Sequence, residues 1–430
     1  MDVTRRQLLV GLAAVGATVG VAGCAPARSS KSSGGSGSGS LAVGWWGNPT
    51  RNKNTAAAIA AYTAAHKGLT ITGQPGEFAT YWDKLATQVA GGSAPDLIQM
   101  DVSYISEYGG RGALLDLGAH GADVSKFASG TVDSGKVGGK LVGVNLGINT
   151  WAIAVNPKLF VKAGVALPDD TTWTWDDLMN VSAEVAGKTG SYGLTAFFNQ
   201  EPAFGTFLRQ IGKAEFTESG IAFDAGDAQQ FFDLMVKFQK AKAMPPAAAL
   251  TEDAGKSLDQ MAFGTNKAAL TGSINSNQLE AVNNASGSQM KLLRAPSMTG
   301  KAADRKAWYK ASMLWSVSAK TKDPKASVDL VNWWVNSTEC ANINLAERGI
   351  PANTEILAAI TPKLSAAQQS VAKFLADIKP ELATPPVNAP KGGGKLADML
   401  LRYETDVLFG RSSTKDAATK FTEELKSGLG

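Results

Sequence analysis

The residues that usually carry metal or nucleophilic chemistry are scarce in this chain. Two histidines and two cysteines occur among its 430 residues. His66 and His120 have neither a cysteine nor a second histidine at metal-ligand spacing, and no Gly-x-Ser-x-Gly nucleophile motif occurs. The sequence therefore predicts no metal site, no cofactor and no nucleophilic active site.

Carboxylates are more numerous, and a pair of them can hydrolyse a glycosidic bond. Asp169–Asp170, Asp176–Asp177 and Glu423–Glu424 lie at the starts or on the faces of expected helices, where acidic side chains satisfy free N–H groups and the helix dipole. Glu77 and Asp101 instead follow expected strands and could reach the roughly 5–10 Å separation of a glycosidase pair. We favour a protein without catalytic activity, and a hydrolase stays open as an alternative.

Aromatic side chains can stack on a flat ligand face or fill a core. Helical spacing with apolar neighbours favours core packing for Trp82 and for one of Trp333 and Trp334. Five other rings follow expected strands or precede expected helices, where binding sites form. These are Trp45, Trp46, Phe78, Trp173 and Trp308. For each of the five, ligand contact and core packing remain open.

Alternating strands and helices are expected to position these residues. The expected strands are 41–46, 69–73 and 95–101, and the expected helices are 54–68, 81–92 and 102–112. Such alternation predicts parallel pairing through right-handed crossovers, with ligands beyond the carboxyl ends of the strands. The segments at those ends are 45–48, 76–78 and 100–101.

Size and composition describe a large folded chain of modest charge. From Leu41 onward about 390 residues remain, which at ~150 residues per domain predicts two domains. The net charge of +4 and the absence of a basic run argue against nucleic-acid binding. Cys340 is expected to be a buried apolar residue without a disulfide. The Pro- and Gly-rich stretch 379–395 predicts a surface loop before the last helices.

The N-terminus has the pattern of an export signal. Arg5 and a second arginine precede an apolar stretch, and Val-Ala-Gly directly precedes Cys24. This ending resembles the lipobox of bacterial lipoproteins, which implies a signal peptide over 1–23 and lipidation of Cys24. The Gly/Ser-rich segment that follows predicts a flexible tether over 24–40. The paired arginines also resemble a twin-arginine signal, so the export route stays open.

Five segments spread along the chain carry a further resemblance. They are YWDKLATQVAGGSAPDLIQMD (81–101), LVGVNLGINTWAIAVNPKLF (141–160), MAFGTNKAALTGSIN (261–275), RGIPAN (348–353) and VLFGRSSTKDAATKFTEELKSG (407–428). In this order they resemble the extracellular solute-binding proteins of carbohydrate ABC importers, the family that includes maltose-binding proteins. The second and third segments are similar to strands that cross between two lobes.

The resemblance implies an α/β fold of the periplasmic-binding-protein type II. Two lobes, each a mainly parallel sheet flanked by helices, would be joined by hinge strands and close on a ligand. The first lobe would comprise 41–147 plus 269–312, and the second 148–268 plus 313–430. The protein would be a monomer, tethered by its lipid to the outer face of the cell membrane.

The implied function is to bind a mono- or oligosaccharide in the cleft between the lobes and to deliver it to the permease of an ABC importer. Carried over by position, the expected ligand contacts combine flat rings with polar side chains. They are Trp46, Asn48, Phe78 and Asp101 from the first lobe, Asn149, Gln200 and Glu201 from the second, and Ser273, Asn275, Trp308 and Arg348 near later crossings and turns. Family members often have an aromatic shortly after Gly272, where this chain has Ile274 and Asn275.

Three alternatives remain. The same fold could bind a polyol phosphate, an amino compound or an acidic sugar, with cations from Arg51, Lys53, Lys310 and Arg348. A surface glycan hydrolase would need two paired carboxyl groups and would release product. A purely structural envelope lipoprotein would not place tryptophans at strand ends.

Overall fold

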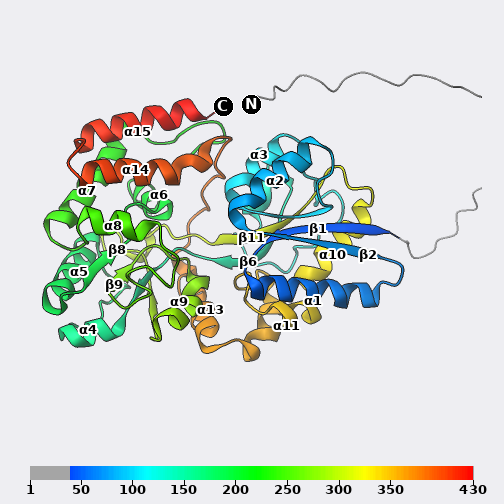
Figure 1. The fold of residues 1–430 in the computed structure, drawn as a ribbon, viewed down its shortest axis with the longest axis horizontal. Coiled ribbons are helices and arrows are strands. Elements are labelled where there is room, and N and C mark those ends of the chain that lie inside the picture. Colours follow the sequence, from blue (N-terminus) through cyan, green and yellow to red (C-terminus); the bar gives the residue numbers. More distant parts are fainter. Residues whose placement is uncertain (1–38, 430) are drawn as a thin grey trace, which may run out of the picture. The chain divides into compact units, whose positions relative to one another are not determined.

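The structure, a computed structural model, describes residues 39–429 and consists of helices around two main sheets, together with a small two-stranded sheet (Figure 1). The strands are β1 (Ser40–Trp46), β2 (Thr70–Gly76), β3 (Leu97–Met100), β4 (Lys136–Val137), β5 (Lys140–Leu141), β6 (Val144–Asn149), β7 (Ile153–Val155), β8 (Tyr192–Thr195), β9 (Ala268–Thr271), β10 (Lys291–Leu293) and β11 (Lys310–Val317). The helices are α1 (Pro49–Ala65), α2 (Phe78–Ala90), α3 (Val102–Gly110), α4 (Pro157–Ala163), α5 (Trp175–Thr189), α6 (Glu201–Gln210), α7 (Ala225–Lys240), α8 (Ala247–Ala254), α9 (Leu279–Ser286), α10 (Pro324–Asn336), α11 (Thr338–Asn344), α12 (Thr354–Ile360), α13 (Ala366–Asp377), α14 (Leu396–Leu408) and α15 (Thr414–Gly428).

The first sheet has the order β2-β1-β3-β11-β6. Strand β1 runs parallel to both β2 and β3, as the sequence predicts, whereas β11 runs antiparallel to β3 and β6. Helices α1, α10 and α11 pack on one face, and α2 and α3 on the other (Figure 1). Helix α1 begins at Pro49, five residues before the expected start, because the Asn48 side chain caps it by accepting a hydrogen bond from the Arg51 N–H.

The second sheet has the order β10-β7-β9-β8, and only β8 and β9 pair in parallel. One face packs on a core rich in phenylalanine that is formed with α4–α7, α14 and α15. The other face packs against α9, α12 and α13. Each sheet therefore has helices on both faces, which confirms the predicted α/β class. The sheets are mixed rather than mainly parallel, because strands that return from the other lobe enter antiparallel to their neighbours.

The strand pairing corrects the predicted division between lobes. Strands β9 and β10 fall within 269–312, which the prediction placed in the first lobe, yet both lie in the second sheet. Strand β11 lies in the first sheet over its whole length, and α10 packs beneath it, although 313–430 was assigned to the second lobe. The reason is that β9 is not a crossing strand: the chain crosses between β6 and β7 and again just before β11.

The predicted signal peptide, the lipidation site Cys24 and all but the end of the predicted tether lie outside the described residues. Ser40, the last tether residue, already begins β1. Within 39–429, none of the helices combines the length and apolar character needed to cross a membrane.

Candidate functional site

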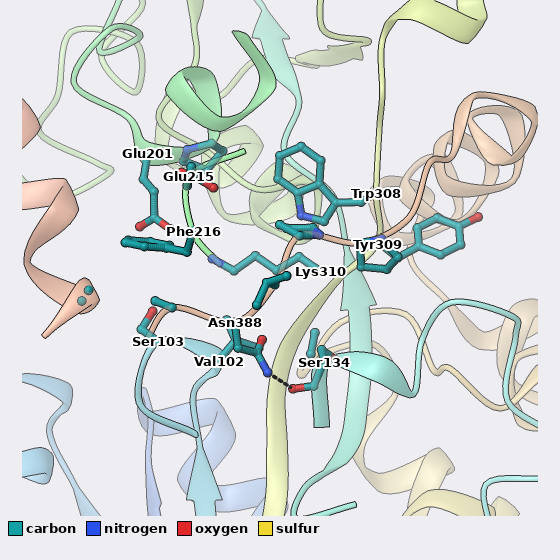
Figure 2. Close-up of a pocket in the computed structure, with 18 residues that line it drawn as sticks. Val102, Ser103, Ser134, Glu201, Glu215, Phe216, Trp308, Tyr309, Lys310 and Asn388 are labelled. Atoms are coloured by element: carbon teal, nitrogen blue, oxygen red, sulfur yellow. Dashed lines mark hydrogen bonds between the residues drawn. The ribbon is translucent and has the colours of Figure 1, made fainter. Parts of the chain in front are cut away.

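A pocket lies where elements of the first sheet meet elements that pack on the second (Figure 2). From the first come Val102 and Ser103 at the start of α3, Ser134, and the beginning of β11. The opposite wall comes from the start of α6, the Glu215–Phe216 loop and the segment 385–394. The space inside, including the part open to solvent, is about 760 Å³.

Two carboxyl groups and one amine supply the charge of the pocket lining. Glu201 is the first residue of α6 and is half-buried, whereas Glu215 follows the helix in a loop and is buried. Lys310 is the first residue of β11, and its side chain extends toward Glu201 and Phe216 (Figure 2). The lining therefore carries one more acidic than basic side chain.

Burial controls the protonation of these carboxyl groups. Removal from water, followed by the charge of Glu201, raises the pKa of Glu215 well above its usual range, and Arg209 and Lys310 only partly oppose this rise. The pKa of Glu201 is raised in the same way by burial and by Asp101, while Lys310 lowers it. The two groups therefore share an environment that disfavours two negative charges, unless a cation joins them.

Aromatic side chains form the apolar part of the pocket. Trp308, Tyr309 and Phe216 all line it. The Trp308 ring is held by Arg209, whose guanidinium carbon lies 5.0 Å from the ring centre. The Tyr309 hydroxyl donates to the Leu375 carbonyl at 2.8 Å, so the polar end of this ring is occupied by the protein. A flat apolar ligand face can pack on such rings.

The segment Ala383–Ala389, here called the strap, spans the pocket between the two lobes. At one end Arg209 donates to the Thr384 carbonyl at 2.6 Å, and the Ala383 N–H donates to the Ala307 carbonyl. At the other end the Asn388 side-chain amide donates to the Ser134 carbonyl at 3.2 Å (Figure 2). It also donates to the Lys136 carbonyl at 3.3 Å. The strap thus joins elements of both lobes over the pocket.

Two of the predicted contacts, Glu201 and Trp308, line this pocket. Asp101 lies next to it, because it caps α3 by accepting from the Ser103 N–H at 2.9 Å and its charge acts on Glu201. Gln200 directly precedes α6 and donates to Asn199 at 3.0 Å, outside the lining. The predicted groups around the start of α6 therefore lie near one another, but not all of them face the pocket.

The other first-lobe predictions lie elsewhere. Trp46 is 7% exposed and packs against Phe78, Tyr81 and Trp82 with ring centres 5.2–5.5 Å apart. Phe78 is the exposed edge of this cluster, at 48% exposure. Asn48 is used as the cap of α1. Core packing, one of the two possibilities left open for the first-strand tryptophans, is found for both: Trp45, at 3% exposure, packs on the other face of the sheet, where Gly73 leaves room for its ring.

The predicted residues near the crossings form hydrogen bonds within the protein. Asn149 ends β6 and donates to Ser312 at 3.1 Å and to Asn277 at 3.3 Å. The Ser273 hydroxyl lies 2.9 Å from that of Thr271, and Asn275 forms a bridge with Trp151. These three residues lie outside the pocket lining.

The prediction that Arg348 contacts the ligand is wrong for this pocket, because the Arg348 side chain is buried inside the first lobe. It donates to Thr55 at 2.7 Å, Asn344 at 3.0 Å and Gln99 at 3.3 Å, and it lies over the Trp334 ring. Burial lowers its pKa to about 9. These contacts tie α1, β3 and α11 together and give Arg348 a structural role.

Several pocket residues have no signal in the sequence. Glu215 lies in a loop, Ser103 and Ser134 are isolated hydroxyls, and the strap falls in the stretch predicted as a surface loop. Pro385 and Pro386 are a sequence signal for the strap, because proline restricts the backbone of this segment. Lys310 was considered only as a possible partner of an acidic ligand.

Two sheets with a pocket between their lobes define the class: a two-lobed binding protein. The family model described as bacterial extracellular solute-binding protein matches residues 57–372. The chain belongs to this family, which confirms the predicted resemblance.

Solved structures of this kind show the same fold. An extracellular solute-binding protein of family 1 from Alicyclobacillus acidocaldarius is 24% identical with a TM-score of 0.71, covering 91% of this chain and 98% of that one. A periplasmic oligogalacturonide-binding protein from Yersinia enterocolitica, in complex with saturated digalacturonic acid, is 18% identical with a TM-score of 0.79, covering 91% and 100%. The GacH receptor of Streptomyces glaucescens, solved unliganded and with acarbose, is 19% identical with a TM-score of 0.72, covering 91% and 98%.

Proposed function

We propose that this protein binds a mono- or oligosaccharide in the pocket between its lobes and delivers it to the permease of an ABC importer. The observation that carries the proposal is the combination of Trp308 and Phe216 with carboxyl, hydroxyl and amine groups around one pocket. Sugars present apolar C–H faces and many hydroxyls, which such a lining matches. The carbohydrate ligands named for two structurally similar proteins support the same class of ligand.

A thermal-shift screen of the purified protein against a sugar panel tests this proposal. A ligand that binds only the folded state raises the melting temperature, and at a fixed concentration a tighter ligand raises it more. Trp308→Ala should remove the shift produced by the best sugar. Trp333→Ala is the matched control, because this half-buried tryptophan lies on α10 against Tyr62, away from the pocket. No shift with any sugar would contradict the proposal.

Binding without catalysis is part of the proposal. Glu77 precedes α2 as an exposed residue, and Asp101 is used as a helix cap, so the pair considered for hydrolysis has no support from the pocket lining. The bound sugar should be recovered unchanged after prolonged incubation with the protein. Steady release of product that disappears in Asp101→Asn would favour the hydrolase instead.

We also propose that a lipid on Cys24 attaches the protein to the outer face of the cell membrane. We further propose that the protein acts as a monomer. The support is the sequence around Cys24, together with a family of extracellular binding proteins. Cys24→Ala should move the protein from the membrane to the soluble fraction. Retention of the variant in washed membranes would contradict the anchor while leaving the sugar-binding proposal untouched.

A further inference from the structure

Glu215 presents a buried carboxylate oxygen that the protein leaves without a partner. Its side chain is 8% exposed and lines the pocket (Figure 2). Among residues 39–429, the Oε1 atom has no hydrogen-bond donor. Burying a polar oxygen without a partner is costly, so a protein rarely keeps one unless something else supplies the partner.

The fold makes room for this carboxyl group. A Cβ atom at Gly205, on the facing turn of α6, would lie 2.7 Å from Glu215 Oε2 and 2.8 Å from its Cδ. Both are closer than real Cβ contacts, so any side chain at position 205 would have to displace the carboxyl group. The glycine thus allows Glu215 to sit against the helix beside Glu201.

The nearby cations do not neutralise the pair by direct contact. Arg209 directs its Nε to the Lys306 carbonyl at 3.1 Å and its Nη2 to Thr384, and within 39–429 it forms no ion pair with Glu215. Lys310 likewise has no carboxylate within 4.0 Å in the described part of the chain. Both cations act on Glu215 from a distance, and the pKa values of Glu215 and Glu201 stay raised, so the pair lacks the close cation that would let both carboxyl groups ionise.

We infer that the ligand carries a cationic amino group, which binds between the Glu201 and Glu215 carboxylates. This inference rests on the proposed function and narrows the ligand class to amino sugars. An ammonium group supplies several N–H donors and one positive charge, which together satisfy the free Oε1 and join two like charges. An acidic sugar would instead place a third carboxylate beside the pair, so this ligand class is disfavoured.

Matched sugars test the inference with the full-length protein near neutral pH. Glucose, glucosamine, N-acetylglucosamine and glucuronate differ at one substituent, and the galactose series and the corresponding disaccharides repeat the comparison. Titration calorimetry should show the free-amine member of the best series binding about ten- to a hundredfold more tightly than its hydroxyl and N-acetyl counterparts. The carboxylate member should bind most weakly.

Glu215→Gln separates this inference from the proposed function. The variant keeps the shape and removes the charge, so it should lower the affinity for the amine sugar about tenfold more than the affinity for the hydroxyl sugar, which removes the preference for the amine. Gly205→Ala should also weaken the preference by displacing the carboxyl group. Glu218→Gln, an exposed glutamate in the same loop, is the control and should keep the preference.

Three outcomes overturn the inference. If the hydroxyl and amine sugars bind equally well, Glu215 is a protonated donor to a neutral ligand. If the carboxylate member binds best, Lys310 decides the specificity instead. If Glu215→Gln keeps the amine preference, the amino group binds elsewhere. In each of these cases a sugar still binds, so the proposed function survives; if no sugar in any series binds, the proposed function fails and the inference with it.

Discussion

Arg209 forms a cation–π contact with Trp308, with its guanidinium carbon 5.0 Å from the centre of the ring. The same guanidinium donates to the carbonyls of Lys306 and Thr384. One side chain on α6 therefore fixes the aromatic wall of the pocket and one end of the strap. A pocket built this way is preorganised, so less ordering is needed when the ligand binds.

Arg209→Ala should weaken sugar binding about tenfold, because it removes a cation–π contact and two charge-assisted hydrogen bonds that position the pocket. Calorimetry with the best sugar of the panel measures the effect. Arg411→Ala is a close control, since Arg411 lies 4.9 Å from the centre of the Phe409 ring at the exposed end of α14. If Arg209→Ala and Arg411→Ala bind the sugar with equal affinity, Arg209 is not needed to position the Trp308 ring.

The strap should contribute to the closed arrangement of the lobes. Asn388→Ala removes two hydrogen bonds to Ser134 and Lys136, each worth about 0.5–1.5 kcal/mol. We expect sugar affinity to fall several-fold, mainly through faster dissociation. Stopped-flow tryptophan fluorescence gives the dissociation rate. Asn342→Ala, an exposed amide on α11, should change neither quantity.

The sequence predicted local structure well and strand partners poorly. Short strand-like segments located β1 to β3 and helical spacing located the helices that follow them, because such signals act between neighbours in the chain. Which lobe takes β9 or β11 depends on contacts between segments that are far apart in the chain. No local pattern encodes that choice, and the predicted boundaries failed there.

The candidate site divides in the same way. Glu201 and Trp308 were predicted because the family resemblance carries ligand contacts over to their positions, and both line the pocket. Arg348 was misassigned because a charged residue in a cleft-side turn normally faces water, and nothing local reveals that Thr55 and Gln99 satisfy its donors. Glu215 was missed because its chemistry arises from burial, which tertiary packing alone determines.

Trp46 should behave as a core residue. Its ring contacts three other aromatics and is almost fully buried, so Trp46→Ala should lower the free energy of unfolding by about 3–5 kcal/mol. Phe78→Ala, at the exposed edge of the same cluster, should cost about 1 kcal/mol or less. Urea denaturation without ligand measures both. A Trp46→Ala variant that keeps its stability but loses sugar binding would return this ring to the ligand site.

Glu404 should make the protein less stable as the pH rises. This residue of α14 is buried, and burial alone raises its pKa from 4.5 to about 8. Below pH 4.5 both the folded and the unfolded chain hold the proton, so the stability associated with this group is fully present. Between pH 4.5 and 8 the unfolded chain releases the proton while the folded chain retains it, so stability falls as the pH rises through the folded pKa. The total loss is on the order of 4 kcal/mol.

Glu404→Gln removes this titration, so it should gain stability relative to the wild type as the pH rises from 5 to 8. Urea denaturation at several pH values gives the difference between the two proteins. Using that difference cancels the contributions of Glu201 and Glu215, whose raised pKa values act in the same direction in both. Glu423→Gln, exposed on α15, should track the wild type at every pH. A wild-type-minus-variant difference that stays constant with pH would show that Glu404 has a normal pKa and reaches water.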